Sequence, residues 1–327
     1  MALRIEDYAL IGDCETAALV GRDGSIDWLC WPRFDSDACF TALLGTPEHG
    51  RWLIGPKDVG ARVTRRYRDG TLVLETRFET PDGAVTLIDF MPLRNQISDL
   101  VRIVRGERGR VAMHTEFIVR FVYGTTVPWV TRLDDGTLRA IAGPDMLLLR
   151  TPINLHGEGR KTIGEFDVGE GEEIPFVLSY SPSHLSPHRP VDPFAALERT
   201  EHYWRKWSGG LPQHGPWTEM VRRSVITLKA LTYAPTGGIV AAPTTSLPEV
   251  LGGSRNWDYR YAWPRDASIS VAAFLVAGKH REAPAFLAWL LHASRVARVG
   301  GDAGSAGPTE NQPASGPPTS RPNTGAE

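Results

Sequence analysis

The sequence has 327 residues, of which 42% are hydrophobic and 23% are charged, so the chain can bury a substantial core and is not mainly disordered. Its 36 basic and 38 acidic side chains leave a formal net charge of −2, which excludes a global positive field for binding nucleic acid. The length predicts about two domains.

The first 40 residues carry the three cysteines. Cys14, Cys30 and Cys39 match neither a disulfide framework nor the spacing of a zinc site, which predicts buried thiols in a reducing compartment. Glu6 and Asp7 stand where a signal peptide has its apolar core. No apolar run approaches the ~20 residues of a membrane span. We therefore expect a cytoplasmic protein without a membrane segment, and nothing in the sequence indicates a cofactor or a metal site.

Up to about residue 188 the apolar residues alternate with a period of two, which is typical of β-strands. The pattern predicts strands over residues 71–78, 84–90, 111–119, 145–150, 162–168 and 174–180. Turn residues separate them at 81–83, 106–109, 134–136 and 169–171. Short strands at this spacing predict an antiparallel β-sandwich over residues 1–189.

After residue 190 the apolar period becomes helical. Asp192 as N-cap and Pro193 at the first helical position begin a helix that ends at Trp207, within a linker over residues 190–215. Further helices are predicted over 217–233, from Pro264 to a stop at Gly278, and over 282–296. The last of these is apolar over most of its surface, so we expect it to be buried.

These helices define a second predicted domain, residues 216–298, after the β domain. The segment 299–327 consists mainly of Gly, Pro, Ser, Thr and Ala, and from Gly300 on it contains no large apolar residue. Such a composition cannot offset its chain entropy by burial, so we expect a disordered tail.

The segment 255–267 contains four aromatic side chains, three Arg and two Asp, directly before a predicted helix. This combination suits sugars, because their C–H faces stack on aromatic rings and their hydroxyls bond carboxylates and guanidinium groups. The simpler interpretation is that Asp266 only favours the positive end of its helix, that Arg265 belongs to a surface ion pair, and that the aromatics are core. Composition alone leaves both open.

The motif Asn256-Trp-Asp-Tyr-Arg-Tyr-Ala-Trp-Pro-Arg-Asp266 resembles the substrate-binding signature of glycoside hydrolase family 15, which contains glucoamylases and trehalases. Residues 237–249 also resemble this family, and residues 5–13 and 16–35 are similar to the β-sandwich domain of its bacterial trehalase-like members. The resemblance covers about residues 4–298. Family members commonly carry Leu or Thr at the position of Pro264, which proline can occupy at the first helical position.

The resemblance implies a fold and a substrate site. The fold is a β-sandwich followed by the first helices of an (α/α)6 barrel, and the substrate is an α-glucoside such as trehalose or a maltooligosaccharide. Arg265 and Asp266 would bind the glucose unit in the −1 subsite. The implied substrate-binding residues are Asp258, Tyr259, Tyr261, Trp263, Arg265 and Asp266.

Family 15 enzymes are similar in cleaving α-glucosidic bonds with inversion. One carboxylic acid protonates the leaving oxygen, and a carboxylate roughly 6.5–9.5 Å away activates water. The resemblance implies two catalytic Glu late in the barrel, whereas the acids after Glu282 are Asp302, Glu310 and Glu327, which match no catalytic motif. We therefore expect an incomplete barrel, no catalytic residue in this chain, and no turnover by the chain alone. A truncated gene model explains the abrupt tail equally well.

Two other functions fit the same residues. The chain could be a carbohydrate-binding module that binds glucose without hydrolysis. It could instead be a complementing or structural subunit, because an incomplete barrel exposes an apolar face that self-associates or recruits the missing helices.

Three further motifs are better explained by structure than by chemistry. Trp28 and Trp31, in the cluster at 27–35, are predicted to pack inside the sandwich, although this cluster could also reach the sugar site. Residues 157–162 resemble a phosphate loop without its register and predict a hairpin turn. The stripe of His202, Tyr203, Trp204 and Trp207 is predicted to pack.

Overall fold

The computed structural model describes residues 3–94, 97–186, 189, 191–211, 215–245 and 253–301, with side chains up to residue 295. The chain divides into two compact units, Met1–Trp289 and Leu290–Glu327. The first unit holds the strands and helices α1–α3, and the second begins within α4 (Glu282–Gly301). Residues 302–327, most of the predicted disordered tail, lie outside the described residues.

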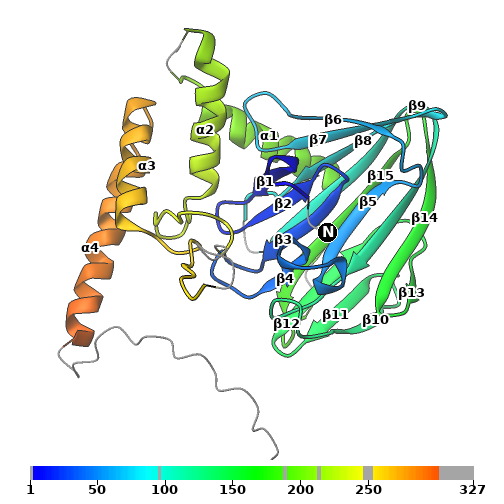
Figure 1. Ribbon diagram of the computed structural model, residues 1–327, viewed down its shortest axis with the longest axis horizontal. Coiled ribbons are helices and arrows are strands. Elements are labelled where there is room, and N and C mark those ends of the chain that lie inside the picture. The colour runs from blue at the N-terminus through cyan, green and yellow to red at the C-terminus, as the bar shows by residue number, and fades with distance from the viewer. Residues whose placement is uncertain are drawn as a thin grey trace, which may run out of the picture. The chain divides into compact units, whose positions relative to one another are not determined.

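The strands form an antiparallel β-sandwich whose two sheets share one strand (Figure 1). That strand is β9 (Ser98–Ile118). Its first half pairs with β8 and β15, and its second half pairs with β5 and β14. One sheet also contains β1 (Tyr8–Gly12), β2 (Ala17–Gly21), β3 (Ser25–Cys30), β4 (Ala38–Phe40), β5 (Arg51–Pro56), β13 (His156–Glu158) and β14 (Lys161–Gly169). The other contains β6 (Arg62–Tyr67), β7 (Leu74–Thr80), β8 (Gly83–Phe90), β10 (Trp129–Arg132), β11 (Leu138–Ala142), β12 (Asp145–Arg150) and β15 (Glu173–Pro182).

The predicted strands correspond to β7, β8, β12, β14, β15 and the second half of β9, but the predicted turn at 106–109 is wrong. Strand β9 continues through these residues and passes from one sheet to the other. Gly109 takes φ +64°, and a Cβ on Gly106 would lie 1.9 Å from the carbonyl oxygen of Gly169. The register of β8 against β9 shifts opposite, between Ala84 and Val85. The two glycines therefore permit a bend within a continuous strand, where local composition indicates a turn.

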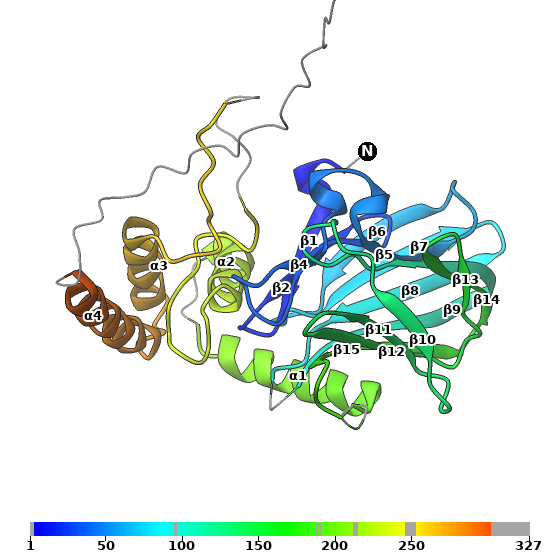
Figure 2. The ribbon, with the colours of Figure 1, turned by 90° about the horizontal axis from the view of Figure 1, so that it is seen from below.

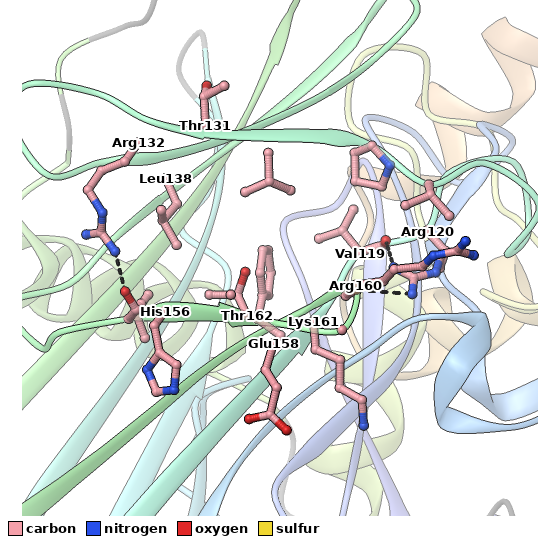
Figure 3. Close-up of a pocket in the computed structure, with 17 residues that line it drawn as sticks. Val119, Arg120, Thr131, Arg132, Leu138, His156, Glu158, Arg160, Lys161 and Thr162 are labelled. Carbon is pink, nitrogen blue, oxygen red and sulfur yellow. Dashed lines mark hydrogen bonds between the residues drawn. The ribbon is translucent and has the colours of Figure 1, made fainter.

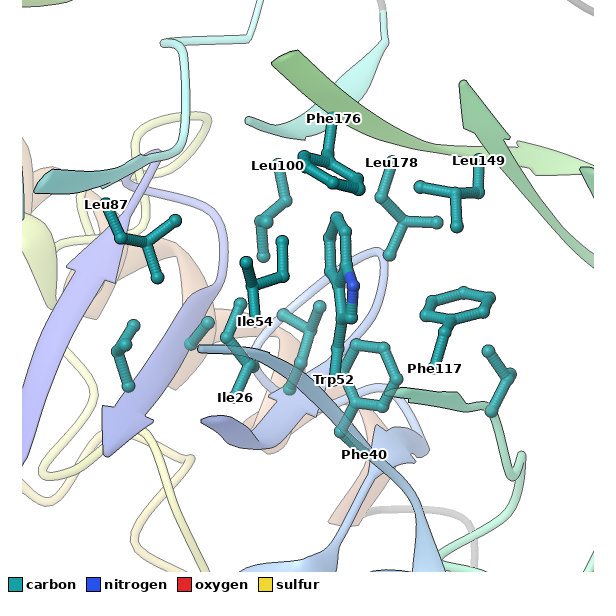
Figure 4. Close-up of a cluster of buried hydrophobic side chains, with 14 of the residues drawn as sticks. Ile26, Phe40, Trp52, Ile54, Leu87, Leu100, Phe117, Leu149, Phe176 and Leu178 are labelled. Atoms are coloured by element: carbon teal, nitrogen blue, oxygen red, sulfur yellow. The ribbon is translucent and has the colours of Figure 1, made fainter. Parts of the chain in front are cut away.

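Large apolar side chains fill the space between the two sheets (Figure 4). Trp52 on β5 is fully buried. Its ring meets those of Phe117 and Phe176 edge-on, with centroids 5.5 and 6.3 Å away. Because Phe117 and Phe176 come from β9 and β15, Trp52 packs the two layers together.

Helix α1 (Pro193–Ser208) covers the outer face of the sheet that contains β15 (Figure 2). Its N-cap is Asp192, whose carboxylate accepts hydrogen bonds from Phe194 N and Ala195 N, as predicted. Leu197 packs on Val177 and neighbouring apolar residues. The part of the sheet under α1 is therefore buried on both faces, which explains why every residue of β8 is buried.

The other helices of the first unit are α2 (Thr218–Ala230) and α3 (Pro264–Val276). Single 3-10 turns occupy Ile5–Asp7, Ala42–Leu44, Pro47–His49 and Gly215–Trp217. Trp204 of α1 is fully buried against Leu72 and Ile226, with Tyr203 and Trp207 packed around it. The packing of the aromatic stripe is thus confirmed for these three residues, while His202 is exposed.

The expectation that the fourth helix is buried is wrong. In the part of α4 that belongs to the first unit, Glu282 and Phe286 are buried, but Leu287 is 54% exposed. An apolar helix surface is buried only where another element packs against it, and the described residues supply such contacts on one side of this helix only.

Two smaller predictions, on the cysteines and on residues 157–162, are confirmed. Cys14, Cys30 and Cys39 are free and buried. Residues 157–162 form the hairpin between β13 and β14. Across the part of the chain that the structure describes, no helix is long and apolar enough to cross a membrane.

Candidate functional site

The aromatic segment, residues 255–267, precedes α3 and is held by backbone hydrogen bonds to residues 239–245. Ala241 and Ala242 donate their N–H groups to the carbonyl oxygens of Tyr261 (3.1 Å) and Tyr259 (2.8 Å). Thr245 and Asp258 form an isolated β-bridge. These contacts fix the backbone of the segment, which turns at Tyr259 and Arg260.

Aromatic rings of the segment stack on one another. Tyr259 and Trp263 lie nearly parallel, with centroids 5.2 Å apart and planes at 20°, and Trp257 meets Trp263 edge-on at 6.2 Å. The indole Nε1 of Trp263 donates to the carbonyl oxygen of Asp258 (3.1 Å), which fixes the ring. Tyr261 is 52% exposed. These rings provide the flat apolar surfaces on which the C–H face of a sugar can stack.

Arg265 and Asp266 occupy the first turn of α3, because Trp263 is the N-cap and Pro264 the first helical residue. Their side chains, 78% and 35% exposed, pair with each other at 3.3 Å between Nη2 and Oδ2. Among the described residues neither side chain has another hydrogen-bond partner. The first helical turn favours a carboxylate, so the pair presents an oriented charge of each sign with unused donors and acceptors.

The remaining predicted site residue, Asp258, is engaged by Arg260. The Arg260 Nη2 group donates to Asp258 Oδ2 at 2.7 Å, and Nε donates to Oδ1 at 3.0 Å. Burial acts to raise the pKa of Asp258, but hydrogen bonds from Arg260 outweigh it and lower the pKa below its ordinary value. The Asp258 carboxylate is therefore ionised and committed to its neighbour.

Arg260 is the residue of this segment that sequence reasoning missed. Its side chain is only 7% exposed, and its Nη1 group donates to the Ser36 carbonyl oxygen (2.9 Å), the Tyr123 hydroxyl (2.5 Å) and Cys30 Sγ (3.4 Å). Burial acts to lower the pKa of Arg260, but these bonds and the one to Asp258 raise it well above its ordinary value. The only sequence signal was its position between Tyr259 and Tyr261 in the charged and aromatic motif.

A cavity of about 260 Å³ lies beside the segment. Tyr261 lines it from one side, and the bidentate pair of Arg33 and Asp35 lines it from the sandwich, with Nε–Oδ1 at 2.8 Å. Arg265 and Asp266 do not line it. The six predicted residues therefore do not share one site: Tyr261 lines the cavity, Tyr259 and Trp263 form the ring stack, and Asp258 binds Arg260. Arg265 and Asp266 lie at the start of α3.

The predicted burial of the two amino-terminal tryptophans is confirmed, with Trp28 0% and Trp31 4% exposed. Trp28 also donates its Nε1 hydrogen to the Pro243 carbonyl oxygen at 2.8 Å. Pro243 belongs to the stretch that holds the aromatic segment. The cluster at 27–35 therefore packs in the sandwich and also supports this region.

Comparison with known protein families identifies both the β-sandwich and the helical region of this chain. Residues 1–180 match the family described as "Trehalase-like, N-terminal", and residues 215–298 match "Glycosyl hydrolases family 15". The chain belongs to glycoside hydrolase family 15. Its trehalase-like β-sandwich precedes the hydrolase region, and the aromatic segment lies within that region. The family resemblance predicted from the sequence is confirmed.

Curated relatives of this family 15 chain carry the name trehalase. It is 34% identical over 318 residues to a trehalase of Mycolicibacterium smegmatis, covering 89% of this chain and 47% of the relative. It is 35% identical over 278 residues to a trehalase of Thermoplasma acidophilum, covering 82% and 47%. The chain therefore spans about half the length of the curated relatives it matches.

A solved bacterial glucoamylase in complex with acarbose has a similar fold. The TM-score is 0.65 at 13% sequence identity, and the match covers 92% of this chain and 51% of the glucoamylase. At this identity the likeness concerns the fold, and it agrees with the predicted order of a β-sandwich followed by helices of an (α/α)6 barrel.

A second cavity of this family 15 chain, about 450 Å³, opens between the β10–β11 and β13–β14 hairpins (Figure 3). Three of its cationic side chains are bonded to other groups of the chain: Arg120 to the carbonyl oxygens of Val119 and Arg160, Arg132 to that of Leu155, and Lys161 to Glu116 at 3.0 Å. Of the described residues that line it, Glu158 is the only acid. The described residues of this cavity supply no pair of carboxylates, so the aromatic segment remains the candidate site. The described residues also contain no group of three or more His, Cys, Asp or Glu placed to hold a metal ion.

Proposed function

We propose that the aromatic segment is part of the sugar-binding site of a family 15 hydrolase acting on trehalose or α-linked glucose oligomers. The observation that carries this proposal is the Arg265–Asp266 pair at the start of α3, close in sequence to the stacked rings of Tyr259 and Trp263. A carboxylate accepts from two sugar hydroxyls, while a guanidinium donates to two oxygens in one plane.

The geometry also argues against a purely structural pair. Among the described residues the Asp266 carboxylate accepts a hydrogen bond only from Arg265, so beyond the favourable position in the first turn, worth about 0.3–1 kcal/mol, it does little for the helix. Arg265 is too exposed for its ion pair to contribute much stability, about 0–1 kcal/mol at most for surface pairs. Two oriented charges with little structural work are available for a ligand.

We further propose that the whole hydrolase cleaves its substrate with inversion, and that its two catalytic carboxylates come from outside the described residues. Inversion requires an acid and a base roughly 6.5–9.5 Å apart across the scissile bond. In the aromatic segment Asp258 is occupied by Arg260 and Asp266 is assigned to binding. The greater length of the curated relatives supports this view. The chain alone should bind sugar without turning it over.

Titration calorimetry with trehalose and with maltose tests the binding site. A charged hydrogen bond contributes about 1.5–3 kcal/mol, so Asp266→Ala should weaken binding roughly 10- to 150-fold. Glu219→Ala is the matched control, because it removes an exposed carboxylate that pairs with Arg222 on α2. Equal affinities for the two variants would refute the assignment. Glucose release at a rate near an ordinary kcat, about 1–10³ s⁻¹, would refute the claim that the chain is inactive alone.

A complementing subunit is the second candidate function, and exposed apolar side chains favour it. Ile269 and Val276 on α3 are 66% and 75% exposed, and Leu287 on α4 is 54% exposed. Such a face would self-associate or accept the remaining barrel helices. Size-exclusion chromatography with light scattering decides, since a stable monomer at high concentration contradicts this function.

The domain boundaries remain part of the proposal. We propose a β-sandwich domain over residues 1–189, a linker over 190–215 and the first part of the hydrolase domain over 216–298. Limited proteolysis should cut first near these boundaries, because connections between domains are the usual sites of cleavage.

A further inference from the structure

We propose that Arg260 is a positioning residue that holds the aromatic segment against the β-sandwich, and that Tyr123 of the sandwich therefore controls the sugar site. This inference rests on the proposed sugar-binding function. It assigns a task to the sandwich: to fix the backbone from which Tyr259, Tyr261 and Trp263 project.

The first support is the number of bonds that one buried guanidinium makes. Arg260 reaches Tyr123, Ser36 and Cys30, which lie 137, 224 and 230 positions earlier in the chain. The same group makes a forked contact with Asp258 of its own segment. Only a planar guanidinium can serve all these acceptors at once, because a lysine ammonium carries three donors on one atom.

The second support is the strained turn that presents Tyr123. Val122 and Tyr123 both have positive φ, 50° and 54°, although β-branched residues rarely adopt this conformation. Hydrogen bonds hold the turn, with Thr125 N and Oγ1 donating to the Val122 carbonyl oxygen and Tyr123 N donating to that of Ala38. Strained backbone persists where its surroundings enforce it, commonly at functional sites. Here it directs the Tyr123 hydroxyl and ring to Arg260, whose guanidinium carbon lies 5.4 Å from the ring centroid.

The third support is the path from Arg260 to the sugar-binding rings. Tyr259 and Tyr261 flank Arg260, and their carbonyl oxygens accept the N–H groups of Ala242 and Ala241. The sandwich holds the same stretch from the other end, where Trp28 bonds Pro243. Loss of the Arg260 contacts would free this backbone on its sandwich side, and the ring stack would lose its fixed orientation.

The test combines hydrogen exchange with sugar binding in the full chain. Tyr123→Phe removes one hydroxyl, and Arg260→Lys removes the forked donor. Tyr180→Phe is the matched control, because it deletes a similar tyrosine hydroxyl that bonds Asp145 within the sandwich. We expect the first two variants to lose at least tenfold protection at the Ala241 and Ala242 amides and to bind maltose or trehalose about tenfold more weakly, measured well below their melting temperatures. The control should change neither.

The two proposals fail separately. If the unmodified chain binds no sugar, the proposed function is wrong, and the exchange measurement still decides whether Arg260 holds the segment. If the chain binds sugar but Tyr123→Phe leaves both protection and affinity unchanged, the positioning role is wrong. Should Arg260→Lys fail to fold, Tyr123→Phe alone decides. A loss of affinity equal to that of Tyr180→Phe also overturns the proposal, because general destabilisation then explains it.

Discussion

Arg102 and Asp89 form a fully buried ion pair inside the β-sandwich, and removing the arginine should destabilise the fold strongly. Both side chains are 0% exposed, and Arg102 Nε donates to Asp89 Oδ1 at 2.7 Å. The two terminal nitrogens of Arg102 also donate to the carbonyl oxygens of Trp52 (2.7 Å) and Gly24 (2.6 Å). One side chain thus satisfies a carboxylate and two backbone groups from different strands and turns.

The expected loss follows from what remains after Arg102→Met. A buried carboxylate without its partner costs about 3–5 kcal/mol. The Trp52 and Gly24 carbonyl oxygens each lose a charged hydrogen bond, although Gly24 still accepts the N–H of Ile54. Burial raises the pKa of Asp89 even beside Arg102, so the variant relieves part of the cost by protonating this carboxyl. We therefore expect a loss of about 3–5 kcal/mol, a large part of the 5–15 kcal/mol typical of folded domains.

Urea denaturation followed by tryptophan fluorescence measures the effect. The double variant Arg102→Met, Asp89→Leu removes both charges, so it should recover most of the loss and retain only the cost of the two carbonyl groups. A single variant that loses less than about 1 kcal/mol, the net worth of an ordinary hydrogen bond, would refute the reasoning. So would a double variant less stable than Arg102→Met.

Two further predictions concern the sandwich and the first helix. Burial lowers the pKa of His114 below 6.5, and its Nδ1 has no partner among the described atoms, so the unfolded chain binds the extra proton more readily. The melting temperature should fall as the pH drops below 6.5. His114→Gln should flatten this pH dependence, whereas the control His156→Gln, at an exposed position, should not. An unchanged slope in His114→Gln contradicts the assignment. Asp192→Ala removes the N-cap of α1 and should lower the free energy of unfolding, measured by urea denaturation, by about 1 kcal/mol. Asp192→Asn should retain most of the stability. An alanine variant as stable as the unmodified chain contradicts the capping role.

Local chemistry made much of this protein predictable from its sequence. The alternation of apolar residues identified strands such as β12 (Asp145–Arg150) at their true bounds, because side-chain period follows directly from strand geometry. Asp192 and Pro264 marked helix starts, because capping depends on the adjacent residues alone. The family, too, followed from contiguous motifs, in the aromatic segment and near the amino terminus.

Contacts between distant residues were decided only by the tertiary structure. Glycines 106 and 109 predict a turn locally, but pairing on both sides makes β9 a single strand that joins the sheets. The apolar surface of α4 predicts that another element packs against this helix, but it does not identify that element. In the sequence, Arg260 is one more charged residue of a sugar-binding motif. Folding brings Tyr123 and Cys30 to its guanidinium from more than 130 positions away. Backbone conformation is encoded by neighbours in the chain, whereas the partner of a buried charge depends on which distant surfaces pack together.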